Sequence, residues 1–410
     1  MKLKIFILFV INIFTLVHKP IKCSPVSKGN ADVNYEDNTI FGGMNYFHIS
    51  NTKEFAVVRK LTERENDDLQ QNCGYVKKNH LADDETTKNN VRRDVSKRFV
   101  NSYDTDFEGR DGFNAIAYAK GKVPDGYSPW TVALGVGNSA FCTGTIISKY
   151  HVLTAAHCLF SYDNPSTKCL GMKSLNLDEH TRVYYGGTCL KKSVDNLCRR
   201  KNVKERRIRR ASYNYHYHLH TCSYGADIAV LEVDHPFEFD NFTQPICMAP
   251  ESFNEKKDMP LNEVIYTLGY GKTELNMSSV YLRKGNSNVC NNQANYYYDS
   301  LSDSFANGVF CLKSCTETDN SKCETFEKMR TGVCRGDSGG PDYVRMNNVP
   351  EGMEKNQRYM LIGVHSSGSD CTPTNLTSDV YHHSAKVSYH VKELCWLTGV
   401  CPKNTQIKLT

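Results

Sequence analysis

Cysteines constrain the fold of this chain more than any other feature, because its 410 residues include 17 of them. Fifteen lie between Cys142 and Cys401, and they show little of the Cys-x-x-Cys spacing that is typical of metal sites. Cysteines at this density indicate disulfides and therefore an oxidising compartment. The length allows two or three domains with a sizeable buried core.

The N-terminus agrees with that compartment. Lys2 and Lys4 precede an apolar run at residues 5–17, after which the chain turns polar. A short apolar run behind a basic start is typical of a secretory signal peptide, and 13 residues are too few to span a bilayer comfortably. Cleavage after Cys23 would leave 16 cysteines, an even number. We therefore expect a secreted protein whose signal peptide is residues 1–23; the alternative is an uncleaved membrane anchor.

Composition excludes several classes of protein. The apolar, aromatic and charged fractions are 40%, 11% and 23%, and the mean hydropathy is −0.52. A multispan membrane protein would be more apolar, and a mostly disordered chain would lack this apolar and aromatic content. The net charge of +5 is too small to suggest a nucleic-acid partner.

The chain divides into a polar leader and a cysteine-rich body. Residues 24 to about 115 are rich in Asn, Asp, Lys and Glu and contain one cysteine, Cys73. Within the leader, Thr62 and Glu65 form a capping-box pattern that predicts a helix ending near Gly74. From Pro129 onward, short β-rich runs recur between turn residues, which favours an all-β barrel or sandwich. The predicted strands are residues 130–136, 145–147, 228–233, 264–268 and 359–364.

Three short segments carry residues suited to nucleophilic catalysis. They are residues 153–158, 226–231 and 334–341, and they contain His157, Asp227 and Ser338. A serine hydroxyl is a weak nucleophile at pH 7 and needs a base to take its proton, and that base needs an acid to fix its tautomer. Gly336 offers a backbone N–H close to a substrate carbonyl without a side chain in the way.

Each segment alone has an ordinary structural explanation, but their order of His, Asp and Ser makes coincidence improbable. With these motifs the chain resembles the trypsin-like serine peptidases over about residues 129–397. Residues 128–130, 141–147 and 268–271 also resemble family strands. The leader pattern at residues 61–74 further resembles the nematode-type branch of the family.

The resemblance implies a fold and a domain plan. We expect two packed six-stranded antiparallel barrels, a short C-terminal helix and a mostly irregular leader. Residues 24–98 would be a pro-region tethered through Cys73, and residues 99–410 the peptidase domain with its core at about 127–398. Polypeptides would be the substrates, and neither a cofactor nor a metal is implied. The spacings from His157 to Asp227 and from Asp227 to Ser338 are long for the family, which predicts extended surface loops.

The resemblance also implies roles around the catalytic residues. The amides of Gly336 and Ser338 would form the oxyanion hole, and Asp337 would pair with the amino group released on activation. The specificity pocket would comprise Gly332, Ser366, Gly368 and Asp379. Because Gly332 stands where an acid is usual, Asp379 on the opposite wall would select Arg or Lys with loose selectivity. The alternative is that Asp379 is a solvated loop acid.

Disulfide pairs follow from the same resemblance. The implied family pairs are Cys142–Cys158, Cys334–Cys371, Cys290–Cys311 and the leader tether Cys73–Cys247. Cys315–Cys323 and Cys395–Cys401 are close in sequence and are expected to be local pairs. Three connectivities remain open for Cys169, Cys189, Cys198 and Cys222, with a zinc site as the alternative.

The activation site has several candidates. A family zymogen is cut before an apolar residue by an activating protease. Lys97 and Arg98 precede Phe99 and form the favoured site. Arg110 lies closer to the body but precedes Asp111, and Ile116 has no basic residue beside it.

A basic run and three sequons complete the predicted features. Residues 199–210 contain eight Lys or Arg residues opposed by Glu205 and are expected to form a loop insertion. This run has three interpretations: a site for anionic polysaccharide, a processing site, or a solvated loop. Asn241, Asn276 and Asn375 are glycosylation acceptors. The function favoured by these features is a secreted serine endopeptidase, and the alternative is a catalytically silent binding protein on the same fold.

Overall fold

The computed structural model describes the residues that form the sheets, two helices and the connections around the predicted catalytic residues. The chain divides into two units, Met1–Val33 and Asn34–Thr410, and every described residue lies in the second. The described residues are 46–50, 58–76, 121–122, 126–137, 139–162, 172–174, 180–188, 190, 203–214, 217, 224–254, 258, 264–271, 278–284, 308–314, 333, 335–346, 358–368 and 381–403.

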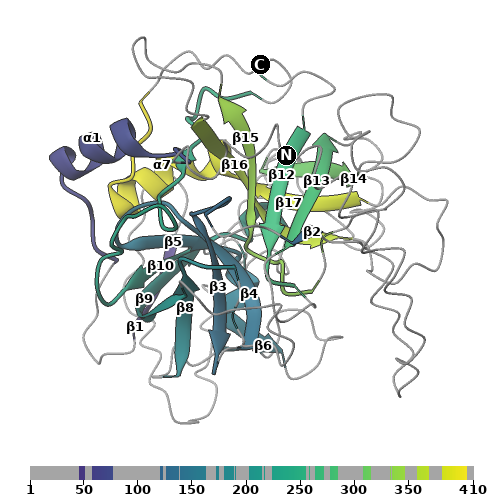
Figure 1. The fold of residues 1–410 in the computed structure, drawn as a ribbon, viewed down its shortest axis with the longest axis horizontal. Coiled ribbons are helices and arrows are strands. Elements are labelled where there is room, and N and C mark those ends of the chain that lie inside the picture. Colours follow the sequence, from purple (N-terminus) through teal and green to yellow (C-terminus); the bar gives the residue numbers. More distant parts are fainter. Residues whose placement is uncertain are drawn as a thin grey trace, which may run out of the picture. The chain divides into compact units, whose positions relative to one another are not determined.

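The first sheet is a closed antiparallel barrel of six strands (Figure 1). Its strands, in chain order, are β3 (Thr131–Val136), β4 (Ser139–Ile146), β5 (His151–Thr154), β8 (Thr181–Tyr185), β9 (Lys204–Asn214) and β10 (Ala229–Val233). They pair in the order β9-β10-β5-β4-β3-β8, and the contact of β8 with β9 closes the ring. A leader strand, β1 (Tyr46–Ser50), pairs with the second half of β9.

The second sheet closes in the same way. Its six ring strands are β12 (Val264–Gly269), β13 (Ser278–Lys284), β14 (Val309–Ser314), β15 (Pro341–Met346), β16 (Arg358–Gly368) and β17 (Tyr381–Lys386). The order is β16-β15-β12-β13-β14-β17, and β16 pairs again with β17. Two short strands, β2 (Gly121–Lys122) and β11 (Cys247–Met248), join β13 and β16. The predicted all-β fold with two six-stranded barrels is therefore confirmed.

Shorter elements complete the body. A short 3-10 helix, η3 (Ala156–Leu159), leads into β6 (Phe160–Tyr162). This strand pairs with β7 (Met172–Ser174) in a separate two-stranded sheet. A second 3-10 helix, η4 (Tyr224–Ala226), leads into β10. Aromatic rings fill the core: the fully buried Trp130 meets Tyr343 edge-on at 5.3 Å and Tyr359 at 5.5 Å between ring centroids.

The basic run was expected in a loop, and this prediction is wrong for its described part. Residues 204–210 belong to β9, which pairs with β8 and β10. Ile208 is buried in the barrel while Lys204, Arg207 and Arg209 are exposed. Ile208, the one apolar residue of this segment, packs in the barrel core. Because side chains alternate between the two faces of a strand, most of the charged side chains point outward. The sequence interpretation considered only the charges. Residues 199–201 lie outside the described residues.

The predicted leader helix is α1 (Glu63–Asn72), and its capping box is present. The N–H of Thr62 donates to Glu65 Oε2 at 2.9 Å, and the N–H of Glu65 donates to Thr62 Oγ1 at 3.3 Å. The hydrogen bond from the backbone N–H of Thr62, together with Lys149, lowers the pKa of the Glu65 carboxyl group to about 2. With β1 and α1 present, the described part of the leader is more regular than expected.

The leader helix packs beside the C-terminal helix, α7 (Val387–Thr398), as Figure 1 shows. The N–H of Leu61 donates to the carbonyl of Thr398 at 2.8 Å. Gly399 ends α7 with φ +72°, and a Cβ there would lie 2.6 Å from the carbonyl oxygen of Leu61. Asn66 exchanges two hydrogen bonds with the backbone of Cys401, at 3.1 and 2.9 Å. The segment 58–76 is therefore an integral part of the body.

Three disulfides are described: Cys73–Cys247, Cys142–Cys158 and Cys395–Cys401, with Cα atoms 4.9, 6.1 and 4.6 Å apart. The side chains of the other predicted pairs, and of the four cysteines left open, lie outside the described residues. Among the residues that the structure describes, no helix is long and apolar enough to cross a membrane.

Replacing the leader disulfide should destabilise the protein more than replacing the C-terminal one. The first joins residues separated by 174 positions and the second residues separated by 6. Loop entropy assigns about 5 kcal/mol to the long link and about 2.5 kcal/mol to the short one. Thermal unfolding should show a larger fall in Tm for Cys73→Ser with Cys247→Ser than for Cys395→Ser with Cys401→Ser. Equal shifts would contradict a structural role for the leader link.

Candidate active site

The centre of the site is a hydrogen-bonded pair, His157 and Asp227. His157 lies in η3, directly after β5, and Asp227 lies between η4 and β10. Nδ1 of His157 is 2.7 Å from Oδ2 of Asp227, and the backbone N–H of His157 donates to Oδ1 at 2.8 Å. The carboxylate therefore holds both the ring and the backbone of the histidine. The side chain of Asp227 is 4% exposed and that of His157 is 25% exposed, so the acid is buried and the ring reaches the surface.

The buried acid tunes the histidine as a base. Burial disfavours the imidazolium, but the charge of Asp227 and its hydrogen bond outweigh this and raise the pKa of His157 above 6.5. Because Nδ1 faces the carboxylate, Nε2 is left as the atom that can accept a proton. This arrangement is that of a general base with an orienting acid.

Ser366 holds the same carboxylate from the second sheet. Its hydroxyl donates to Asp227 Oδ2 at 2.5 Å. The sequence analysis placed Ser366 in the specificity pocket and gave its side chain no partner. The contact with Asp227 comes from residues 139 positions apart in the chain, and no local pattern announces it.

Ser338 follows a tight turn at the start of β15. Its carbonyl accepts a hydrogen bond from the N–H of Thr143 at 2.8 Å, and it lies 3.6 Å from Sγ of Cys158, the neighbour of His157. Ser338 is half-buried. These contacts bring the serine backbone against the residues that flank the catalytic histidine candidate.

Glycine is required on both sides of the serine. Gly339 has φ +83°, and a Cβ there would lie 2.1 Å from Thr154 Oγ1. Gly336 has φ +99°, and a Cβ there would lie 3.0 Å from the Cα of Gly271. The carbonyl of Gly336 accepts from Thr143 Oγ1 at 2.9 Å, so the turn is fixed before and after Ser338.

Asp337 points away from the serine into the second sheet. It is 3% exposed, and its Oδ1 accepts from the N–H of Gly271 at 2.7 Å. A Cβ at Gly269 or Gly271 would lie 2.3 or 2.6 Å from Asp337 Oδ1. The pair of glycines therefore makes room for this carboxylate.

A family model for trypsin matches residues 120–391. The chain belongs to the trypsin family. It is also 27% identical over 267 residues to CLIP domain-containing serine protease B15 of Anopheles gambiae, which is 64% of this chain and 64% of that relative's length. It is 29% identical over 289 residues to coagulation factor IX of Oryctolagus cuniculus, covering 70% of this chain and 84% of the relative. Membership of a nematode-type branch stays a prediction.

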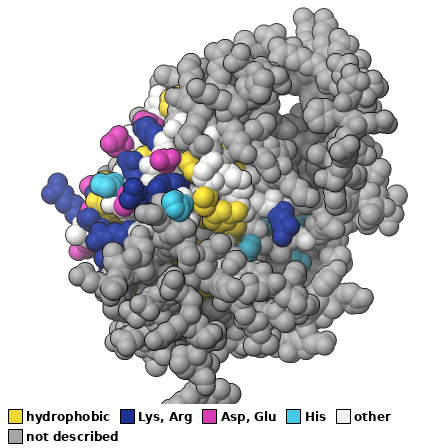
Figure 2. Space-filling model, turned by 90° about the horizontal axis from the view of Figure 1, so that it is seen from below, with side chains coloured by type: hydrophobic (Ala, Val, Ile, Leu, Met, Phe, Trp, Pro, Cys, Tyr) yellow, Lys and Arg dark blue, Asp and Glu magenta, His cyan; other side chains and the backbone are white. Residues whose placement is uncertain are grey.

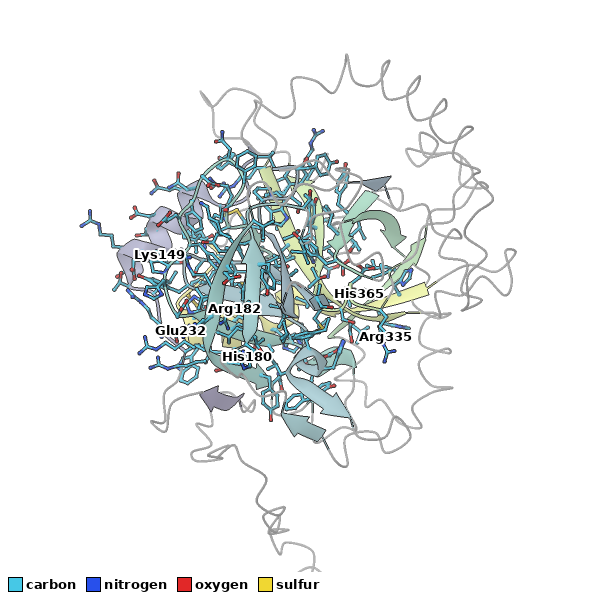
Figure 3. The ribbon with its side chains drawn as sticks, turned by 60° about the horizontal axis from the view of Figure 1, so that its bottom comes forward. Lys149, His180, Arg182, Glu232, Arg335 and His365 are labelled. Atoms are coloured by element: carbon cyan, nitrogen blue, oxygen red, sulfur yellow. A yellow bond between two sulfur atoms is a disulfide. The ribbon has the colours of Figure 1, made fainter. Side chains whose placement is uncertain are left out.

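The predicted specificity pocket is described in part. Ser366 and Gly368 lie on β16, whereas Gly332 and Asp379 lie outside the described residues, so the assignment of Asp379 stays a prediction. In the pairing of β16 with β17, His382 lies opposite Gly368, and the register shifts between His365 and Ser367. His365 lies on the side of the second sheet in Figure 3.

Of the remaining predicted site residues, some lie within the described residues and others lie outside them. Asn241 is half-buried in the turn before Thr243, while Asn276, Asn375, Arg98 and the signal peptide lie outside the described residues. The described group of residues close enough to share a metal is Cys142, His157 and Cys158. Both cysteines are in a disulfide, which leaves one ligand and no metal site there.

Asp227→Asn should lower kcat by about 10⁴-fold, because the amide would favour the wrong histidine tautomer. The activity of the wild type should rise with pH as His157 loses its proton, with a midpoint above 6.5, since its pKa is raised above that value. The variant should shift this midpoint down. A pH–rate profile of kcat/KM measures both effects. Asp234→Asn, outside the site, should leave the profile unchanged; an unchanged profile in Asp227→Asn would contradict the assignment.

Proposed function

We propose that the chain is a serine endopeptidase in which Ser338 is the nucleophile, His157 the general base and then acid, and Asp227 the orienting acid. The observation that carries this proposal is the 2.7 Å contact between His157 and a buried Asp227, with the glycine-bounded Ser338 turn beside it. Membership of the trypsin family and the two serine protease relatives support it.

The reaction requires no cofactor. Nε2 of His157 takes the hydroxyl proton as Ser338 Oγ bonds to the substrate carbonyl carbon, and the carbonyl oxygen becomes an oxyanion. The N–H groups of Gly336 and Ser338 would hold that charge, a contribution worth about 3 kcal/mol for one donor. Collapse of the intermediate breaks the C–N bond, and His157 gives its proton to the leaving amine. Water then repeats the sequence and releases the acid from Ser338.

Asp227 acts at two stages of this catalytic cycle. It keeps Nδ1 protonated before the reaction and stabilises the imidazolium after the proton moves. Both functions require the carboxylate to be held in place, and the donors from the backbone and ring of His157 and from Ser366 provide this.

The protein would be secreted and made as a zymogen. We propose cleavage of residues 1–23 as a signal peptide and activation after Arg98, with residues 24–98 as the pro-region and 99–410 as the peptidase domain. The amino group of Phe99 would pair with Asp337, which is buried and has room made for it by Gly269 and Gly271. The leader would stay attached through Cys73–Cys247.

Further partners follow from surface features. An activating protease and polypeptide substrates are implied by the mechanism, and glycans are proposed at Asn241, Asn276 and Asn375. Binding of an anionic polysaccharide at residues 199–210 has less support than the sequence alone gave it. Lys204 already pairs with Asp240, and both Arg209 and Arg210 pair with Glu232. Figure 2 shows acidic side chains among the Lys and Arg side chains that gather on one part of its face.

The preference for Arg or Lys rests on Asp379 alone. Asp379 lies outside the described residues, and on the wall that the structure describes His382 lies opposite Gly368.

Ser338→Ala should abolish peptide hydrolysis, with a loss of about 10⁶-fold, because the triad acts as a unit. The turn is set by glycines, so folding and secretion should be unaffected. A fluorophosphonate probe should label the activated wild type at Ser338 and fail to label the variant, while Ser139→Ala, exposed on β4, should be labelled normally. The alternative function, a silent binding protein, predicts no labelling of the wild type under any activation condition.

The two chains produced by activation should stay together. On a non-reducing gel the cleaved protein should run as one species and separate into two with reductant. The matched variant Cys73→Ser should separate without reductant. Loss of the leader from the cleaved wild type in the absence of reductant would contradict the tether.

A further inference from the structure

A histidine of the C-terminal helix bonds to the segment that carries Asp227. His390 lies on α7 and is 1% exposed. Its Nε2 is 2.6 Å from the carbonyl oxygen of Gly225, which belongs to η4 and stands two positions before Asp227. A carbonyl oxygen can only accept a hydrogen bond, so Nε2 carries the proton and donates. The bonded residues are 165 positions apart, and the contact joins η4 to the helix that follows the last strand of the second barrel.

Other groups from the second barrel enclose the same carbonyl. A Cβ added at Gly308, directly before β14, would lie 3.1 Å from the carbonyl oxygen of Gly225 and 3.2 Å from the ring of Tyr389. The carbonyl of Gly308 accepts from the N–H of Lys386, the last residue of β17, at 2.8 Å. Gly225 is itself buried. Loss of the bond from His390 would therefore leave a buried acceptor without that donor, which is costly.

The backbone on each side of Asp227 is held from a different barrel. Downstream, the carbonyl of Ile228 accepts from the N–H of Asn214 on β9 at 3.3 Å. Upstream, the bond from His390 holds the carbonyl of Gly225. The donors described above act on the carboxylate itself, whereas these two bonds locate the backbone from which the carboxylate projects. Because a side chain is aimed through its backbone, the upstream bond bears directly on the geometry of the catalytic pair.

The helix that carries His390 is itself fixed. Leu394 and Leu397 are 0% and 1% exposed, so one side of α7 is packed into the core. At its end, the carbonyl of Thr398 accepts from the N–H of Leu61 in the leader, and α1 lies beside α7 in Figure 1. The helix is thus a rigid support from which the imidazole can hold η4 in place.

We propose that His390 is a positioning residue for the catalytic pair, acting through the carbonyl of Gly225 on Asp227. It touches neither the substrate nor the reacting atoms, and it acts by keeping the carboxylate of Asp227 aligned with His157. This inference rests on the proposed endopeptidase function of Ser338.

The test compares activated full-length enzymes on one peptide substrate, chosen from a library by the wild type. Fluorophosphonate labelling of Ser338 comes first, because it reports the nucleophile whatever the state of α7. Without labelling of the wild type the proposed function fails, and this inference falls with it. With labelling, the variants decide the positioning function alone and leave the endopeptidase intact.

His390→Leu removes the donor and should lower kcat about tenfold, short of the roughly 100-fold that a misplacement of about 1 Å can cost. KM should stay within about twofold of the wild type, because the bond touches no substrate. The midpoint of the pH profile of kcat/KM should fall, since a displaced Asp227 raises the pKa of His157 less. His390→Gln keeps an N–H donor at a similar distance from the backbone and should restore kcat and the midpoint.

Two further variants keep the test decisive if His390→Leu fails to fold. Gly308→Ala crowds the carbonyl of Gly225 from the other side and should lower kcat about threefold and move the midpoint the same way. The matched control Val391→Ala, the next residue of α7 and also buried, should lower the Tm and keep the wild-type kcat and midpoint.

Three outcomes would overturn the inference. The first is a wild-type kcat and midpoint in folded His390→Leu or in Gly308→Ala. The second is a His390→Gln variant no more active than His390→Leu. The third is a midpoint shift in Val391→Ala equal to that of His390→Leu, because a general loosening of α7 would then explain both.

Discussion

Thr143 is the residue on which the geometry of the site depends. It lies on β4 of the first barrel, and its backbone N–H and its hydroxyl donate to the carbonyls of Ser338 and Gly336 in the second. The same hydroxyl accepts from the N–H of Tyr270 at 3.0 Å. One small side chain therefore fixes the nucleophile turn and the neighbouring segment relative to β4, which pairs with the strand that leads to His157. Because Thr143 is fully buried, water cannot replace these bonds at low cost.

Asp227 supplies the second link between the barrels, and the leader supplies a third outside the site. The carboxylate accepts from His157 in the first barrel and from Ser366 in the second. On the outer surface, Arg358 of β16 donates to the backbone of Gln70 and Cys73, next to the disulfide with Cys247. The leader thus braces the strand that also carries Ser366, which connects a segment upstream of the proposed activation site to the catalytic centre.

Structural features encoded by residues that are close together in the sequence could be predicted, whereas features set by the pairing of distant strands could not. The capping box of Thr62 and Glu65 spans three positions, so the sequence alone located α1. The segments around His157, Asp227 and Ser338 were equally local. By contrast, the contact of Ser366 with Asp227 and the place of His382 opposite Gly368 depend on how distant strands meet. The strand at residues 204–210 was missed because one buried residue, Ile208, outweighs the charges around it.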